Sequence, residues 1–256
     1  RDLLLEQTVE VPEQLVPADL RPRVMGRVDR VEPAGRRRFR AELHYPAHLA
    51  EQCLAQLLNL LYGNVSIKKK VRLEDVDLPE TLLATWRGPR YGIDGLRRRV
   101  GVFGRPLLAT ALKPRGSSHD ELARIAGDFA RGGGDLIKDD HNMIEADFEA
   151  FRARVLRCRD AVEQANARTG RNCLYLPNIM HRADQLDEVL QLLEDEDLPG
   201  ILISPQIVGW DTVRAIAENH QFVIMAHPAF SGPYYTHRDM GIDPGVLLGM
   251  LTRLAG

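Results

Sequence analysis

The chain has 256 residues, of which 44% are hydrophobic, and its formal net charge at pH 7 is -2. This length suits one large α/β domain or two smaller domains, with a normal buried core. The small net charge argues against nucleic-acid binding, and the apolar runs are too short to span a membrane. Its three cysteines lie far apart with no CxxC pair, which is typical of reduced thiols in a cytoplasmic protein.

The two ends of the chain indicate a fragment. The sequence begins at Arg1 rather than at a methionine, and it stops at Gly256 directly after a helical pattern. We therefore expect a longer protein from which part of the fold is missing here.

The first ninety residues predict a small α+β domain. Residues Arg23–Val31 and Arg37–Tyr45 alternate in the manner of strands around a Pro-Ala-Gly turn, which predicts an antiparallel hairpin. Apolar residues between positions 49 and 61 recur at helical spacing until Gly63 ends the run. Val71–Leu78 is a further predicted strand. Together these segments predict a sheet with a helix on one face.

From Gly104 onward, strand and helix patterns alternate strictly. Each predicted strand is short and apolar, as in a parallel sheet buried on both faces. The predicted strands are Leu107–Leu112, Asp135–Lys138, Cys173–Asn178, Gly200–Ser204 and Phe222–His227. The helical patterns that follow them are a stripe after the Ser118/Glu121 capping box, Phe148–Arg168, Asp184–Leu193, Asp211–Glu218 and Pro244–Leu254.

These five βα units favour an incomplete (β/α) barrel, because an eight-fold barrel needs three more units. The rival architecture is an open, doubly wound sheet. Its glycine-rich GxGxxG turn does not follow the first strand of this series.

Ionisable residues gather at the ends of the predicted strands, where a barrel places its active site. The strand ends carry Lys113-Pro114-Arg115, Lys138-Asp139-Asp140-His141, Pro177-Asn178, Ser204-Pro205 and His227-Pro228. Any one of these groups alone is more often a solvated strand end. Their recurrence at successive strand ends predicts a site.

The spacing within this group suggests specific chemistry. Lys138 and Asp140 share one face of their strand, so they form a salt bridge, or Lys138 takes up CO2 as a carbamate that binds a hard cation. Lys113, desolvated among other positive charges, would have its pKa lowered toward the range of a general base. His227 could exchange protons near neutrality.

Several motifs resemble the RuBisCO large subunit. The resemblance rests on Gly104–Leu108, on Lys113-Pro114-Arg115 and on the run from Gly132 to Asp140. The segment from Leu73 to Ile93 resembles the family's link between its two domains, and the resemblance covers nearly the whole chain. It implies a ferredoxin-like α+β domain over residues 1–90, then a TIM-type barrel over residues 91–256 that is truncated after the fifth βα unit.

The resemblance also implies roles for single residues. Lys113 would be the base that forms an enediolate, Lys138 the lysine carbamylated by CO2, and Asp140 a ligand of Mg2+. His227 and Arg115 would contact a phosphorylated substrate. Glu6 in Glu6-Gln7-Thr8 and Asn64 in Gly63-Asn64-Val65 would complete the site across a homodimer interface.

The departures from the family pattern point to its RuBisCO-like (form IV) branch. His141 stands where a glutamate is expected as third metal ligand, and imidazole suits Mn2+, Fe2+ or Zn2+ better than Mg2+. Arg115 replaces a lysine and cannot deliver a proton. Pro228 replaces an arginine that would bind phosphate. The run from Ala226 to Gly232 resembles RuBisCO-like proteins rather than carboxylases.

We therefore expect a lyase or isomerase that acts on a phosphorylated keto-sugar or sugar acid through an enediolate-type intermediate, by decarboxylation, carboxyl transfer or isomerisation. Genuine ribulose-bisphosphate carboxylation would need the full metal triad. A methionine-salvage diketo-phosphate enolase should also keep that acidic triad. A non-catalytic, truncated remnant is the alternative from another class. The phosphate-binding residues and the flexible-loop lysine would lie beyond Gly256.

Overall fold

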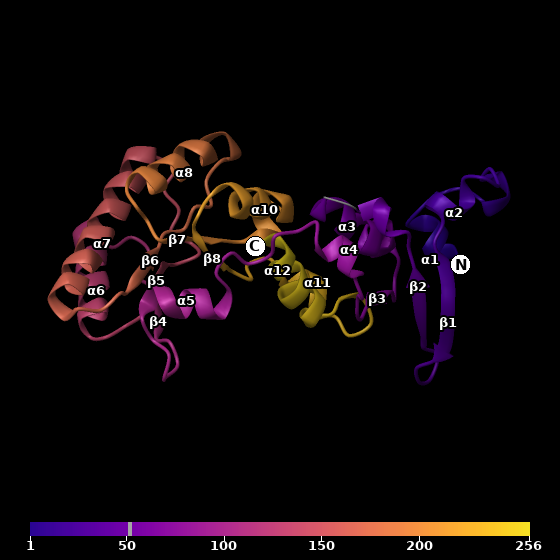
Figure 1. Ribbon diagram of the computed structural model, residues 1–256, viewed down its shortest axis with the longest axis horizontal. Helices are drawn as coiled ribbons and strands as arrows, with labels where there is room; N and C mark the ends of the chain where they lie inside the picture. The colour runs from indigo at the N-terminus through magenta and orange to yellow at the C-terminus, as the bar shows by residue number, and fades with distance from the viewer. Residues whose placement is uncertain (51–52) are drawn as a thin grey trace. The chain divides into compact units, whose positions relative to one another are not determined.

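The computed structural model describes residues 1–50 and 53–256. The chain forms two compact units (Figure 1). The first unit comprises Arg1–Arg87 and Ser231–Ala255, and the second comprises Gly88–Phe230 with Gly256. The boundary predicted near residue 90 stays a prediction. None of the described helices is both long enough and apolar enough to cross a membrane.

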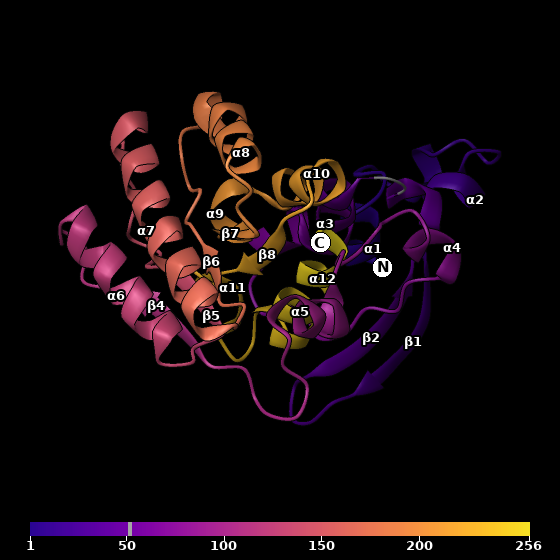
Figure 2. The same cartoon turned by 60° about the vertical axis from the view of Figure 1, so that its left-hand side comes forward.

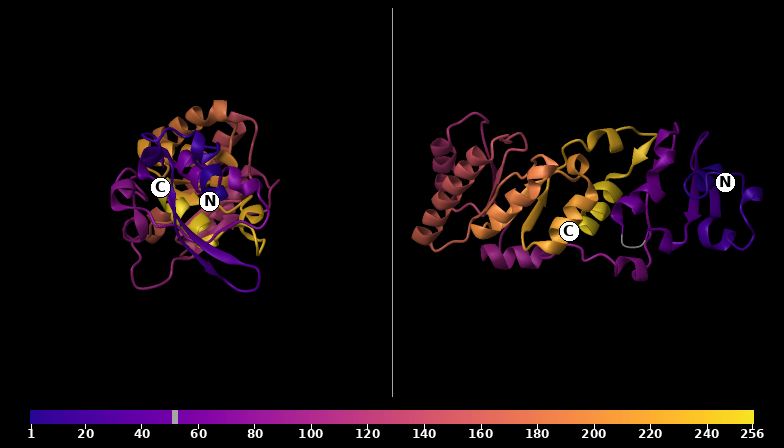
Figure 3. Two further views of the ribbon diagram at one scale, coloured as in Figure 1. Left: turned by 90° about the vertical axis from the view of Figure 1, so that its right-hand side faces the viewer. Right: turned by 90° about the horizontal axis from the view of Figure 1, so that it is seen from above.

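The first unit contains the predicted hairpin. Strands β1 (Arg27–Pro33) and β2 (Phe39–His44) pair antiparallel, with a bulge between Val28 and Arg30. They form a two-stranded ribbon (Figure 3). Beyond the hairpin, β3 (Arg72–Leu73) pairs in parallel with β9 (Gly241–Ile242). The predicted strand Val71–Leu78 is therefore only two residues long in the structure.

The helices of the first unit are short. The helical run predicted over positions 49–61 is confirmed from Leu54 onward as α3 (Leu54–Tyr62), which buries Leu54, Leu57, Leu60 and Tyr62, while its positions 51–52 lie outside the described residues. The other helices are α1 (Asp2–Glu6), α2 (Arg21–Val24), α4 (Glu80–Leu83), α11 (Gly232–Tyr235) and α12 (Thr252–Ala255), with short 3-10 turns at Glu13–Leu15, Ala47–Ala50 and Asn64–Ile67. The last predicted helix, Pro244–Leu254, is π-helical over Gly245–Leu251 before α12, and it belongs to this unit.

The second unit has five parallel strands in chain order, as the sequence predicts. They are β4 (Ala109–Leu112), β5 (Leu136–Asp139), β6 (Leu174–Leu176), β7 (Gly200–Ile203) and β8 (Val223–Ala226). Ladders join β4 to β5, β5 to β6, and β7 to β8. Between β6 and β7 the Leu202 N–H donates to Pro177 O at 2.8 Å, and the Ile179 N–H donates to Leu202 O at 3.1 Å.

Helices alternate with these strands. They are α5 (Gly92–Val100), α6 (His119–Arg131), α7 (Phe148–Thr169), α8 (Leu186–Asp195), α9 (Pro205–Val208) and α10 (Trp210–Asn219). Figure 2 shows α6, α7 and α8 in a row along one side of the strands. This is the βα repeat expected of a barrel-type α/β fold.

The turn between α6 and β5 explains two of the three consecutive glycines. Gly133 has a φ of +97°, a conformation that favours glycine. A Cβ atom on Gly134 would lie 1.9 Å from the ring of Phe129. The chain can therefore turn tightly from the helix into β5, which fixes where that strand begins.

Helix α5 covers the amino ends of the strands. Its Val100 packs in a buried cluster with Leu136, Leu174 and Val223, which lie at or near the starts of β5, β6 and β8. The polar residues of the predicted site lie at the opposite, carboxyl ends of the strands.

Candidate functional site

Four of the predicted site residues meet at the carboxyl ends of β4, β5 and β8. The Nζ atom of Lys113 lies 3.0 Å from Oδ2 of Asp140. The other carboxylate oxygen of Asp140 lies 2.7 Å from Nδ1 of His141. The ring of His141 stacks on the ring of His227 with 4.7 Å between centroids and 9° between planes. The structure thus brings together a lysine, a carboxylate and two imidazoles.

Asp140 is the centre of this cluster. Burial alone would raise the pKa of its carboxyl, but the Lys113 ammonium, the Asn142 N–H at 3.3 Å and His141 together lower it. Asp140 is therefore ionised at neutral pH, and its carboxylate can hold a cation or a positively charged side chain.

The prediction that Lys113 is desolvated was wrong. Its side chain is 62% exposed and paired with a carboxylate, so it is not desolvated among positive charges. Of the two alternatives expected for Lys138, the salt bridge with Asp140 needs correction, and the carbamate stays a prediction. Its Nζ donates to the backbone carbonyl of Asp139 at 2.9 Å, and Asp140 pairs with Lys113 instead. The reason is that Lys113, at the end of the adjacent strand β4, reaches Asp140, and spacing within one strand cannot reveal a partner from another strand.

Lys138 is the lysine whose pKa is lowered. Burial lowers it, the Asp140 carboxylate opposes that effect, and the Lys113 ammonium adds to it. A lowered pKa enlarges the fraction of neutral amine, and only the neutral amine can take up CO2. The structure therefore supports Lys138 as an amine that can take up CO2.

His227 is held as a neutral imidazole. Its Nδ1 accepts a hydrogen bond from the Ala229 N–H at 3.1 Å, so the ring proton sits on Nε2. Burial lowers its pKa, and the positive charges of Lys138 and His141 lower it further. A neutral imidazole with an Nε2–H group can donate a hydrogen bond to a substrate oxygen.

Two of the three predicted metal ligands lie side by side. Asp140 offers a carboxylate oxygen and His141 an imidazole nitrogen, and these two donors are adjacent. The third donor would come from the carbamate, because an ammonium group cannot bind a metal. A mixed oxygen and nitrogen set suits Mn2+, Fe2+ or Zn2+ better than Mg2+.

Arg115 lies beside a separate small cavity of about 240 Å³. It is lined by Arg115, Gly116, Ser117, Leu122, Met143, Ile144, Glu145 and Arg154. Arg115 lies two residues after Lys113 and is exposed, so it keeps the positive charge expected at this position.

Glu6 and Asn64 belong to the first unit, where Gln7 links their segments. The Gln7 side chain donates to Asn59 O and Leu60 O, both at 2.8 Å, and its Oε1 accepts from the Val65 N–H at 2.9 Å. Glu6 pairs with Lys68 at 2.8 Å. The predicted substrate-binding pair is thus brought to one part of the first unit.

A buried polar network beneath the site was missed by the sequence analysis. The Asp139 carboxylate accepts from Arg154 Nη1 at 2.6 Å, from the Tyr175 hydroxyl at 2.8 Å and from the Asn178 N–H at 2.8 Å. Asp139 and Arg154 are fully buried. Burial raises the pKa of Tyr175, and Asp139 raises it further, so the phenol stays protonated and donates.

One signal in the sequence could have revealed this network. Arg154 occupies the apolar stripe of α7 between Phe151 and Val155, both of which are fully buried. A charged residue on such a stripe needs a buried partner. Asn178 carried the weaker signal, since it was only one of several polar residues at a strand end.

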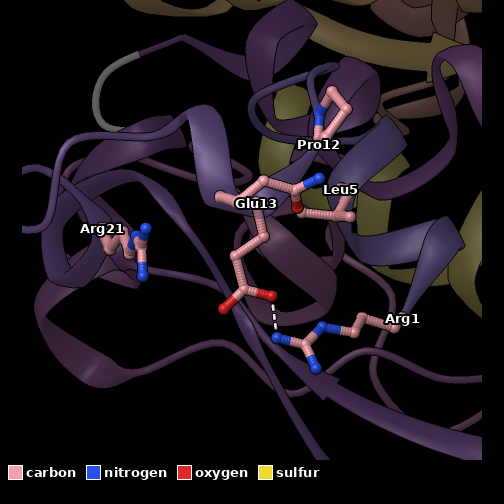
Figure 4. Close-up of a pocket in the computed structure, with 6 residues that line it drawn as sticks. Arg1, Leu5, Pro12, Glu13 and Arg21 are labelled. Carbon is pink, nitrogen blue, oxygen red and sulfur yellow. Dashed lines mark ion pairs between the residues drawn. The ribbon is translucent and has the colours of Figure 1, made fainter.

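Two features of the first unit lie outside this site. Donor atoms of Asp29, Glu42 and His44 lie within 4.8 Å of one another on the hairpin, but their side chains are 42–58% exposed. A cleft of about 520 Å³ is lined by Arg1, Leu5, Pro12, Glu13, Gln14 and Arg21, and in it Arg1 pairs with Glu13 (Figure 4). Arg21 is also satisfied, because its Nε donates to Val16 O at 2.8 Å. We assign neither feature a function.

The five parallel strands and the ionisable cluster at their carboxyl ends define an α/β protein with a barrel-type site. The family model for the ribulose bisphosphate carboxylase large chain, catalytic domain, matches residues 92–256. The chain belongs to the RuBisCO large-chain family, in its RuBisCO-like branch, which confirms the resemblance seen in the motifs.

Individual relatives agree with this assignment. Ribulose bisphosphate carboxylase-like protein 1 of Rhodopseudomonas palustris is 37% identical over 256 residues, covering 99% of this chain and 68% of that protein. The 5-methylthioribulose-1-phosphate isomerase of Rhodospirillum rubrum is 36% identical over 260 residues, covering 100% of this chain and 68% of that protein. A dimeric archaeal Rubisco from Hyperthermus butylicus superposes with a TM-score of 0.91 at 27% identity, covering 100% of this chain and 61% of that one.

Proposed function

We propose that this chain carries the catalytic site of a RuBisCO-like enzyme that moves a proton within a phosphorylated keto-sugar or sugar acid through an enediolate-type intermediate. The observation that carries the proposal is the cluster of Lys113, Asp140, His141 and His227 at one edge of the parallel strands. Isomerisation is the favoured reaction, because the similar Rhodospirillum rubrum protein is a 5-methylthioribulose-1-phosphate isomerase.

The chemistry needs a base beside a carbonyl and a donor for its oxygen. As its free amine, Lys113 would remove a proton from the carbon next to the carbonyl, and its exposed position lets a substrate approach. The electron pair of that C–H bond forms the C=C bond of the enediolate, and the carbonyl oxygen gains negative charge. The Nε2–H group of His227 can donate to that oxygen. The carbonyl oxygen then takes up a proton, the hydroxyl group on the original α-carbon loses its proton to become the new carbonyl, and the protonated lysine returns its proton to the former carbonyl carbon, which completes an isomerisation.

We propose Lys138, Asp140 and His141 as the cation site. Lys138 would supply a carbamate oxygen, Asp140 a carboxylate oxygen and His141 a nitrogen. A bound cation would polarise the oxygen atoms of the substrate. The support is the lowered pKa of Lys138 and the adjacent donors of Asp140 and His141.

Assembly is the third part of the proposal. We propose that the five parallel strands form part of a complete eight-stranded barrel, and that Glu6 and Asn64 of one subunit complete the site of another in a homodimer. The support is the placement of both residues in the first unit and the similarity to an archaeal Rubisco described as dimeric.

Two other enzyme functions fit less well. Carboxylation and the diketo-phosphate enolase reaction are both expected to use an acidic metal triad, and His141 interrupts that triad. A non-catalytic remnant would have no reason to keep an ionised Asp140 between Lys113 and His141.

The test is exchange of the substrate α-proton with deuterated water, measured by NMR in the complete protein with 5-methylthioribulose-1-phosphate as the first probe. Lys113→Met should reduce exchange by about 10²- to 10⁴-fold while ligand binding stays measurable. Lys69→Met, at an exposed lysine of the first unit, is the matched control and should exchange like wild type. Exchange in Lys113→Met within about tenfold of wild type would rule out the proposed base.

A second arm of the same experiment tests the composite site. Asn64→Ala subunits mixed with Lys113→Met subunits should recover part of the activity, because one site in each mixed dimer is intact. If mixed dimers form and no activity returns, the site is not shared between subunits.

A further inference from the structure

Asn178 makes an unusual set of contacts with the segment that carries Asp140 and His141. Its side chain is buried, and its Nδ2 group donates to the backbone carbonyls of His141 at 3.0 Å, Asp140 at 3.3 Å and Met143 at 3.4 Å. Its Oδ1 accepts from the Met180 N–H at 3.2 Å. A single carboxamide therefore gathers three carbonyls of the turn after β5.

The backbone of Asn178 is itself bonded to the buried network around Asp139. The backbone N–H of Asn178 donates to Asp139 Oδ2, the same oxygen that accepts from Arg154 Nη1 at 2.6 Å. Tyr175 on β6 holds the other carboxylate oxygen. Asn178 therefore stands between a rigid, fully buried ion pair and an exposed catalytic edge.

Asn178 is the contact that joins three carbonyls of the turn, which is otherwise held by single contacts, among them the Asn142 N–H to Asp140 Oδ1 at 3.3 Å and Arg154 Nε to Glu145 at 2.9 Å. Residues 140–147 have no helix or strand, and the backbone bonds within the turn run from Met143 N to Asp140 O at 3.0 Å and from Ile144 N to Asn142 O at 3.1 Å. The orientation of Asp140 decides whether its two oxygens face Lys113 and His141. A displacement of about 1 Å at such a group can cost a large factor in rate.

We infer that Asn178 is a positioning residue, which fixes the Asp140–Met143 turn and so holds Asp140 and His141 in register with Lys113 and His227. The inference rests on the proposed function only for the roles of Asp140 and His141. Asn178 acts through these residues, and its carboxamide is fully engaged by protein groups.

The first measurement is hydrogen exchange by mass spectrometry on the peptide that covers residues 140–147. Asn178→Ala removes all three donations, and exchange in this peptide should rise about tenfold or more, because buried carbonyls then lose their partner. Tyr175→Phe is the matched control. It removes one bond to Asp139 and should lower the melting temperature without changing exchange in the peptide.

A second variant separates hydrogen bonding from packing. Asn178→Asp keeps the side-chain volume but sets an oxygen against three carbonyl oxygens, so it should loosen the turn as Asn178→Ala does. Unchanged exchange in residues 140–147 for either Asn178 variant, or an equal rise in Tyr175→Phe, would overturn the inference. If Asn178→Ala fails to fold, Asn178→Asp alone decides.

The functional readout is a split between kcat and KM. Both Asn178 variants should lower kcat for α-proton exchange by about tenfold or more with little change in KM, because the reacting groups are misplaced and substrate binding is not removed. An equal loss in Tyr175→Phe would indicate general destabilisation and would overturn the inference. The hydrogen-exchange arm uses no substrate, so a wild-type protein that shows no α-proton exchange would contradict the proposed function and leave the positioning role standing.

Discussion

Two adjacent aspartates at the end of β5 are both buried but have different partners. Asp139 is fully buried, and its two oxygens accept hydrogen bonds from Arg154, Tyr175 and Asn178. Asp140 faces the carboxyl edge, where its partners are the mostly exposed Lys113 and the ring of His141. Neighbouring residues with the same chemistry therefore serve different purposes, because successive side chains point to opposite faces of the chain.

The comparison shows how the fold can combine the partly exposed cluster around Asp140 with the fully buried network around Asp139. All partners of Asp139 are protein groups on neighbouring elements, so its charge is compensated without solvent. Asp140 is instead paired with His141 and with Lys113, whose side chain is 62% exposed. Stability and reactivity are thus assigned to different residues, which makes them separable by mutation.

The largest expected effect is on folding stability. Asp139→Ala should lower the free energy of unfolding by about 3–5 kcal/mol, because it leaves the buried Arg154 guanidinium without its closest carboxylate. Asp140→Ala should change it by about 1 kcal/mol or less, since Lys113 is exposed. Urea unfolding of both variants is the measurement. Equal losses would contradict the division of roles.

Metal binding should depend on Lys138 and His141, the residues beside Asp140. Titration of metal-free protein with Mn2+ or Zn2+ should give tighter binding with bicarbonate present, and Lys138→Ala should weaken it by about tenfold or more. His141→Glu should shift the preference toward Mg2+. His44→Gln controls for adventitious Zn2+ on the hairpin, where Asp29 and Glu42 lie close by. Tight binding that persists in Lys138→Ala would exclude the carbamate as a ligand.

A smaller effect concerns the opposite end of β5. Asp135 accepts from Arg105 at 2.6 and 2.8 Å and from the Leu108 N–H at 2.7 Å. The bond to Arg105 lowers the pKa of Asp135 below its ordinary 3.8, burial opposes the shift, and the Leu108 N–H adds to it. The folded-state pKa is thus below the unfolded value. The resulting stability is present above about pH 4 and is lost as the pH falls below it.

Asp135→Asn should therefore cost about 1 kcal/mol near neutrality, and the difference from wild type should shrink as the pH falls from 5 to 2. Thermal unfolding across that range measures it. Asp19→Asn, at an exposed position of the first unit, is the control for a simple change of net charge. A difference between Asp135→Asn and wild type that grows on acidification would have the wrong sign for this account.

The sequence predicted the elements with strong periodicity and missed contacts that depend on three dimensions. The hairpin, α3 and the five βα strands follow from alternation, helical spacing and glycine stops. The strand predicted over Val71–Leu78 shrinks to two residues because only Arg72 and Leu73 find a partner, β9, far along the chain. Pattern alone cannot reveal such a distant partner.

The sequence predicted which residues form the site better than it predicted the contacts between them. Lys113, Asp140, His141 and His227 could be placed together because strand ends converge on one edge. The exposure of Lys113 and its bond to Asp140 depend on side-chain positions that spacing does not specify. Asn178 was passed over because its importance lies in three backbone carbonyls, and backbone groups leave no mark in a sequence.

The pairing of β3 with β9 has a consequence for the order of folding. Arg72 and Leu73 pair with Gly241 and Ile242, and the Tyr62 hydroxyl joins the Gly241 N–H to the Val71 carbonyl. On a ribosome, the amino-terminal unit emerges first, yet this ladder cannot close until the chain has been made past residue 242. Closing so long a loop is slow relative to local contacts. The amino-terminal unit should therefore remain incomplete while the strands of the second unit are being synthesised.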